Sequence, residues 1–143
     1  MKTPFSVTTA LLAGFTLALV GSMSVAMRAQ AKPDPKSILD RIYSVAQAQR
    51  GESRFKQSCS SCHTGNSFAG GMFAERWAGQ TMAEAFEFVS NNMPENDPGG
   101  LKKEDYADVL AYILALNAYP VGNDDLPTDR DTLKQYEVVP NPK

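Results

Sequence analysis

Both cysteines and the only histidine of this 143-residue chain fall within five consecutive residues, Cys59-Ser60-Ser61-Cys62-His63. A C-x-x-C-H segment is typical of a covalent c-type haem attachment site. Each thiol can add to one of the two haem vinyl groups, and the histidine that follows is then held beneath the iron. The segment therefore predicts one covalent haem c, attached through Cys59 and Cys62 and ligated by His63.

Three other interpretations of the two cysteines stay open at this point. Cys59 and Cys62 would also suit a short disulfide in a secreted protein. They would suit a thioredoxin-like redox pair, which is expected beside a βαβ unit. A closed zinc site needs four ligands, and only three candidates are present with His63 included. The haem interpretation is favoured because an export segment and a second axial ligand accompany the motif.

The first 31 residues have the organisation of a secretory signal peptide. Lys2 gives a short basic region, an apolar stretch covers about residues 10–20, and Ala29-Gln30-Ala31 fits a small-x-small cleavage site. Cleavage after Ala31 predicts a periplasmic protein, and c-type haem attachment takes place on that side of the bacterial inner membrane. The alternative is an uncleaved membrane anchor, since apolar and small residues continue to Met27, about the minimum for a spanning helix.

Cleavage would leave residues 32–143, a length typical of one small domain. The whole chain has a formal net charge of −2. The leader contains basic residues only, Lys2 and Arg28, so the mature chain is more acidic still. This charge argues against nucleic acid and anionic membrane surfaces as partners. Membrane attachment is expected only if the leader remains uncleaved.

Hydrophobic periodicity predicts an all-α fold with three main helices and no convincing pair of strands. These helices are expected over about Val45–Ser58, Met82–Asn92 and Lys103–Asn117, with one short additional turn over Met72–Trp77. Ser44 with Gln47, and Thr81 with Glu84, fit capping boxes at the first two helix starts. Lys102 is a poor N-cap for the third helix.

Two extended segments are predicted to flank these helices. Residues 32–43 form an N-terminal arm whose apolar side chains, Ile38, Leu39, Ile42 and Tyr43, can pin it to the core, with a short helix capped by Ser37 as an alternative. Residues 120–143 contain four of the nine prolines and form a C-terminal tail. We expect this tail to pack on the domain or on a partner.

Met93 is the best candidate for the second iron ligand. The mature chain has no second histidine, and Met72 follows His63 too closely to cross the ring edge comfortably. Met82 belongs to a predicted core stripe. Met93 lies just past a helix end, where Pro94 favours an extended conformation. His/Met ligation raises the haem potential and favours electron transfer.

Trp77 is the only tryptophan and has two interpretations. Its indole N–H needs a partner if the ring is buried, and a haem propionate is a plausible acceptor. The alternative is a core aromatic bonded to a backbone carbonyl.

From about Ser44 to Asn117 the chain resembles the class I cytochromes c. The likeness includes the attachment motif, preceded by Gly51 and Phe55 at the usual spacing, and the distal-ligand position, matched by Met93. Tyr112 stands where the family has an aromatic residue packing on the first helix. The resemblance implies a cytochrome c domain over residues 44–119, with three main helices around one haem. It implies a Gly51–Tyr112 contact at the helix crossing and a single-electron carrier rather than an enzyme.

A narrower likeness suggests partners. The segments at 76–81, 93–94, 98–101 and 106–108, and the tail from about residue 120 to 133, are similar to cytochromes c associated with quinoprotein (PQQ) dehydrogenases. We expect transient docking to redox proteins, either a dehydrogenase or a respiratory complex. The likeness makes a dedicated subunit or electron acceptor of a quinoprotein dehydrogenase the alternative function. A haem-based sensor with labile Met93 is the third interpretation.

Overall fold

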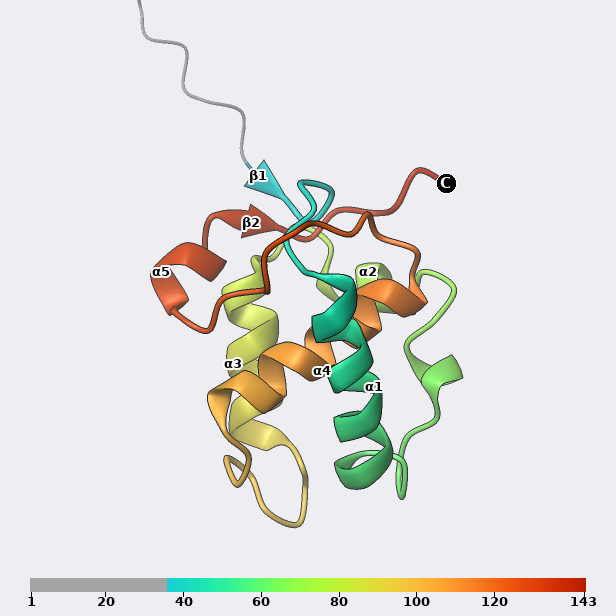
Figure 1. Cartoon of the computed structure of the whole chain (residues 1–143), viewed down its shortest axis with the longest axis vertical. Helices are drawn as coiled ribbons and strands as arrows, with labels where there is room; N and C mark the ends of the chain where they lie inside the picture. Colours follow the sequence, from blue (N-terminus) through green and yellow to red (C-terminus); the bar gives the residue numbers. More distant parts are fainter. Residues whose placement is uncertain (1–35) are drawn as a thin grey trace, which may run out of the picture. The chain divides into compact units, whose positions relative to one another are not determined.

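The computed structural model describes residues 36–143, so the predictions for residues 1–35, including the signal peptide, lie outside the described residues. The regular secondary structure of the described part consists of helices and one two-residue parallel strand pair (Figure 1). The helices are α1 (Val45–Ser58), α2 (Met72–Trp77), α3 (Met82–Asn92), α4 (Lys103–Leu116) and α5 (Arg130–Leu133), with a 3-10 turn at Gly65–Ser67. The strands are β1 (Lys36–Ser37) and β2 (Tyr136–Glu137). None of the helices in residues 36–143 is both long and apolar enough to cross a membrane.

The main helices form where the periodicity predicts them, and α4 ends one residue early, at Leu116. The capping box of Thr81 and Glu84 is complete in both directions. At α1 only half of the predicted box forms: the Ser44 side chain accepts from the backbone N–H of Gln47 at 3.0 Å. The Gln47 amide does not return to the cap, because it is buried and bonded to the C-terminal tail instead.

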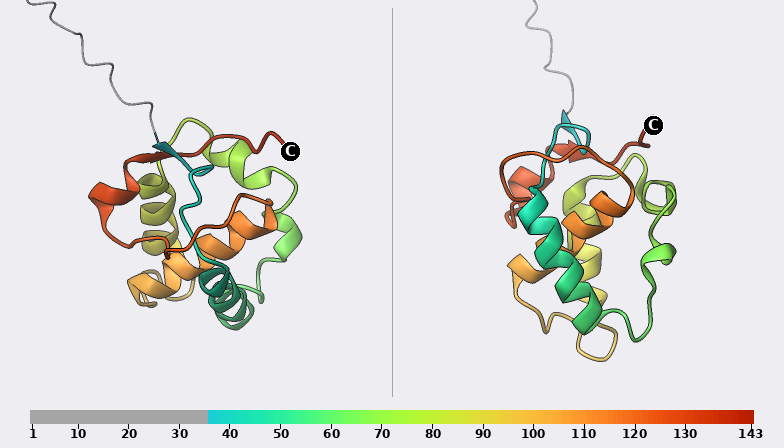
Figure 2. Two further views of the ribbon diagram at one scale, coloured as in Figure 1. Left: turned by 45° about the horizontal axis from the view of Figure 1, so that its top comes forward. Right: turned by 45° about the vertical axis from the view of Figure 1, so that its right-hand side comes forward.

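Helix α1 crosses α4 at close range, as two views show (Figures 1 and 2). Gly51 makes this approach possible, because a Cβ there would overlap the carbonyl oxygen of Asp108 and lie 3.0 Å from the Cβ of Tyr112. The predicted contact between Gly51 and Tyr112 at the helix crossing is therefore confirmed. Ion pairs join the same two helices on either side of the crossing: Arg50–Asp108 at 3.0 Å and Arg54–Asp105 at 2.9 Å.

The N-terminal arm and the C-terminal tail lie side by side at the end of the domain where α1 begins (Figure 2). Their apolar side chains are buried in the common core: Ile38, Ile42 and Tyr43 from the arm, and Leu126, Leu133 and Val138 from the tail. The Ser37 alternative of a capped helix is wrong. Ser37 pairs with Glu137 in the strand pair, and its N–H is bonded to the carboxylate of Asp40 in a turn. The sequence did not predict the strand pair, because a strand of two residues is too short to show an alternation of apolar and polar side chains.

Candidate haem site

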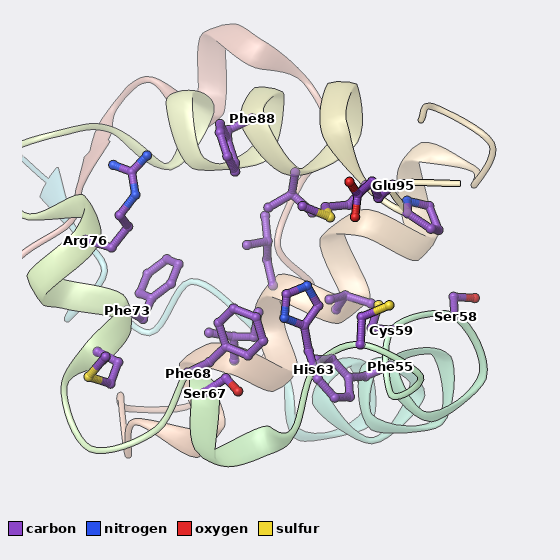
Figure 3. Close-up of a pocket in the computed structure, with 18 of the residues that line it drawn as sticks. Phe55, Ser58, Cys59, His63, Ser67, Phe68, Phe73, Arg76, Phe88 and Glu95 are labelled. Atoms are coloured by element: carbon purple, nitrogen blue, oxygen red, sulfur yellow. The ribbon is translucent and has the colours of Figure 1, made fainter. Parts of the chain in front are cut away.

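A cavity of about 740 Å³ opens between the C-x-x-C-H segment, helix α2 and the loop that follows α3 (Figure 3). Its volume is within the range of about 300–1,000 Å³ that is usual for ligand and cofactor sites. All five residues singled out in the sequence line it: Cys59, Cys62, His63, Trp77 and Met93. Aromatic and aliphatic side chains supply most of the remaining wall, including Phe55, Phe68, Phe73, Val109, Leu110 and Ile113.

The C-x-x-C-H segment is a tight turn at the end of α1. The N–H of Cys59 still donates to the carbonyl of Phe55, at 2.8 Å. The carbonyl of Cys59 then accepts from both Cys62 and His63, at 3.2 and 2.9 Å. These hydrogen bonds fix the backbone of His63 next to the two cysteines. The imidazole ring lies in the middle of the cavity and packs against Phe68, with ring centroids 5.3 Å apart (Figure 3).

The state of the cysteines disfavours two of the alternative interpretations. Both thiols are free, so they form no disulfide with each other. Burial raises the pKa of the Cys59 thiol, whereas a reactive Cys-x-x-Cys pair depends on a lowered thiol pKa. Cys59 is half-buried at the cavity wall and Cys62 is exposed at its mouth.

Met93 approaches the cavity from the other side, at the C-terminal end of α3. Its backbone is extended (φ −125°, ψ 150°), as the following proline predicts, and its N–H closes the helix on Val89 at 2.9 Å. In Figure 3 its neighbour Glu95 lies on the α3 side of the cavity, while His63 rises from the opposite side. Met82 is fully buried in the core. Met72 lines the cavity as well, but it is 51% exposed.

Arg76 lies at the end of the cavity away from Cys59 (Figure 3), and its neighbour Trp77 lines the cavity as well. Trp77 is buried against Phe88, with ring centroids 5.4 Å apart. The Arg76 guanidinium lies 4.7 Å from the centroid of the Trp77 ring. Within residues 36–143, neither the indole N–H nor this guanidinium has a hydrogen-bond acceptor. Two hydrogen-bond donors therefore border this end of the cavity without a protein partner.

The comparisons with known proteins agree with this geometry. Residues 46–113 match the family model described as cytochrome C oxidase, cbb3-type, subunit III. That range contains helices α2 and α3, most of α1 and α4, the C-x-x-C-H turn and Met93. Residues 46–113 have the all-α fold of a class I cytochrome c. No curated protein and no solved structure matched the chain.

The residues of this cytochrome domain fit a covalent haem. Two thiols lie next to an imidazole whose ring nitrogens have no hydrogen-bond partner within residues 36–143. Met93 lines the same cavity, the walls are apolar, and the Arg76 guanidinium borders the far end. Imidazole and thioether are established axial ligands of c-type haem iron.

Hydrogen bonds between residues far apart in the sequence stabilise the loops that form the cavity wall. The sequence alone did not predict them. The Asn117 amide at the end of α4 donates to the Phe68 carbonyl at 2.6 Å and accepts from the Gly71 N–H at 2.9 Å. Val138 of the tail exchanges backbone hydrogen bonds with the turn after Trp77, at 3.0 Å from Gly79 and 2.8 Å to Gln80. Arg76 was missed as a site residue, although its position beside Trp77 was a usable signal.

Proposed function

We propose that the chain is a periplasmic one-electron carrier that holds one haem c through Cys59 and Cys62, with His63 and Met93 as axial ligands. The observation that carries the proposal is the convergence of these four side chains on one apolar cavity. When bound, haem c supplies the one-electron Fe(II)/Fe(III) couple. The match to a cytochrome c domain implies haem-based electron transfer. The position of His63 and Met93 in the cavity wall supports these two residues as the iron ligands.

His63 and Met93 have different tasks in this proposal. The imidazole is tethered by the preceding cysteine, so its binding to iron is nearly intramolecular. The thioether of Met93 is a soft ligand that favours Fe(II) and so raises the potential. With both His63 and Met93 bound, the iron would have no open position, which favours a carrier over the haem-based sensor.

Arg76 and Trp77 complete the site at the end away from Cys59. Arg76 and Trp77 would hold the propionate groups of a haem attached at Cys59 and Cys62. The indole N–H and the guanidinium would then donate charge-assisted hydrogen bonds to the carboxylates. This assigns Trp77 to cofactor binding and adds Arg76 to the predicted set.

Electron transfer to redox proteins would use the mouth of the cavity. Cys62, Met72 and Phe88 line the cavity and are exposed, and small, transient interfaces are usual for redox encounters. The quinoprotein dehydrogenase remains the alternative partner, and the family match lends it no specific support. Docking through the tail would have to use its exposed side chains, because Leu126, Leu133 and Val138 are buried in the chain's own core.

The decisive experiment compares two methionines of the same cavity. Met93→Ala should abolish the weak red absorption band of ferric iron bound to a thioether, lower the reduction potential and open the ferrous protein to carbon monoxide. Met72→Ala should leave all three properties near those of the unmodified protein. If the red band persists in the Met93 variant, the proposed ligand set is wrong.

A further inference from the structure

Tyr106, in the first turn of α4, joins the two ends of the loop that follows Met93. Its hydroxyl donates to the carbonyl of Met93 at 2.7 Å and accepts from the N–H of Leu101 at 3.3 Å. The side chain is 2% exposed and packs edge-on against Phe86, with centroids 6.4 Å apart. Tyr106 does not line the cavity, so any effect on a bound group would act through Met93.

The loop between these two ends has few other attachments. Its own backbone forms two turns, from Asp97 N–H to the Pro94 carbonyl and from Gly100 N–H to the Asp97 carbonyl. In the described part of the chain, Tyr106 is the only side chain outside residues 93–101 that hydrogen-bonds to their backbone. One buried hydroxyl thus fixes the position of the Met93 carbonyl relative to α4.

We propose that Tyr106 is a positioning residue that keeps the Met93 thioether directed into the cavity and thereby limits its dissociation from iron. The inference rests on the proposed ligation by Met93. Because an iron–thioether bond is weak, the loop that carries Met93 would contribute to keeping that bond formed. Removing the hydroxyl leaves the Met93 carbonyl and the Leu101 N–H without a partner in a part-buried place, which favours an opened loop.

The test is Tyr106→Phe in the haem-loaded protein, which removes the oxygen and keeps the ring that packs on Phe86. We expect the fraction of protein with a dissociated thioether to rise about fivefold to tenfold, the factor for one hydrogen bond of this kind. It is measured as a lower temperature for loss of the red ferric band and as faster carbon monoxide binding to the ferrous protein.

Tyr43→Phe is the matched control. The Tyr43 hydroxyl donates to the Tyr119 carbonyl, also at 2.7 Å and buried, but remote from Met93 in the arm. Both variants should lose similar stability to denaturant, and only Tyr106→Phe should weaken the red band. Equal behaviour of the band in the two variants would overturn the positioning role. A missing red band in the unmodified protein would instead overturn the ligation by Met93.

If Tyr106→Phe does not accumulate, hydrogen exchange of the unmodified protein decides the matter. The Leu101 N–H should be protected although it lies in a loop, because it donates to the Tyr106 hydroxyl. Exchange as fast as that of an exposed, unbonded loop amide would contradict the proposal.

Discussion

The side-chain amide of Gln47 and the backbone of Leu126 form a reciprocal pair of hydrogen bonds. The Gln47 carbonyl accepts from the Leu126 N–H at 2.6 Å, and its NH₂ donates to the Leu126 carbonyl at 3.2 Å. The neighbouring Ser44 hydroxyl donates to Asp125. The C-terminal tail is therefore fixed to the start of α1, the helix whose other end leads into the C-x-x-C-H turn.

Replacing Gln47 by alanine tests this attachment. Gln47→Ala leaves the N–H and carbonyl of Leu126 without partners, so we expect a loss of about 2–3 kcal/mol in unfolding free energy. Denaturant titration measures the loss, and limited proteolysis should show cleavage in residues 120–130. Gln49→Ala, an exposed change on the same helix, is the control. Equal stability of the two variants would show that the tail is not held by this pair.

Gly51 tests the helix crossing. Gly51→Ala places a methyl group against the Asp108 carbonyl, so α1 and α4 must separate. We expect destabilisation of about 3 kcal/mol, at the upper end for overpacking, with a reduced yield of haem-loaded protein. Ser53→Ala, exposed on α1, should be close to neutral. A Gly51→Ala protein as stable as this control would contradict the close crossing.

The contrast between Gly51 and Gln47 shows what the sequence alone can predict. Helices α1, α3 and α4 and the Thr81–Glu84 cap depend on residues within a few positions of one another, so spacing predicts them. The contact of Gly51 could be predicted because the family resemblance identified Tyr112 as the aromatic residue that packs on the first helix. Gln47 has a local cap partner in the sequence, yet it bonds to Leu126, 79 residues away, and no local pattern contains that information.

In the candidate site, too, the sequence predicts the local features and not the long-range contacts. The chemistry of Cys59, Cys62 and His63 is contained in five consecutive residues, and the cavity brings Trp77 and Met93 to them. Tyr106 and Asn117 support the site through backbone carbonyls that lie 13 and 49 residues away. A tyrosine or asparagine at such a position gives no sign of the contact, so the sequence predicted no role in the site for Tyr106 or Asn117.

Acid should loosen the tail through Asp125. The Ser44 hydroxyl and then Arg50 hold the pKa of the Asp125 carboxyl below its usual range. The contact therefore stabilises the folded chain above the unfolded-state pKa of about 3.9, and this contribution is lost as the pH falls through the lower folded-state pKa. As the pH falls from about 5 to 2, the unfolding free energy of the Asp125→Asn variant should decrease less than that of the unmodified protein. Parallel stability curves would contradict this coupling.

Arg76 tests the far end of the cavity. If its guanidinium neutralises the propionates, Arg76→Gln should lower the reduction potential, because a nearby positive charge favours the ferrous form. Lys134→Gln removes one exposed cation that does not line the cavity and should shift the potential less. A redox titration of both variants checks the prediction. Equal shifts would remove Arg76 from the proposed site.

The most direct test of the whole account is the intact mass of the denatured protein after export. We predict a polypeptide heavier by one haem, with the mass addition retained in acidified organic solvent and lost in the double variant Cys59→Ala, Cys62→Ala. A colourless protein, or a pigment that acidified solvent extracts from the chain, would contradict covalent haem attachment at these two residues.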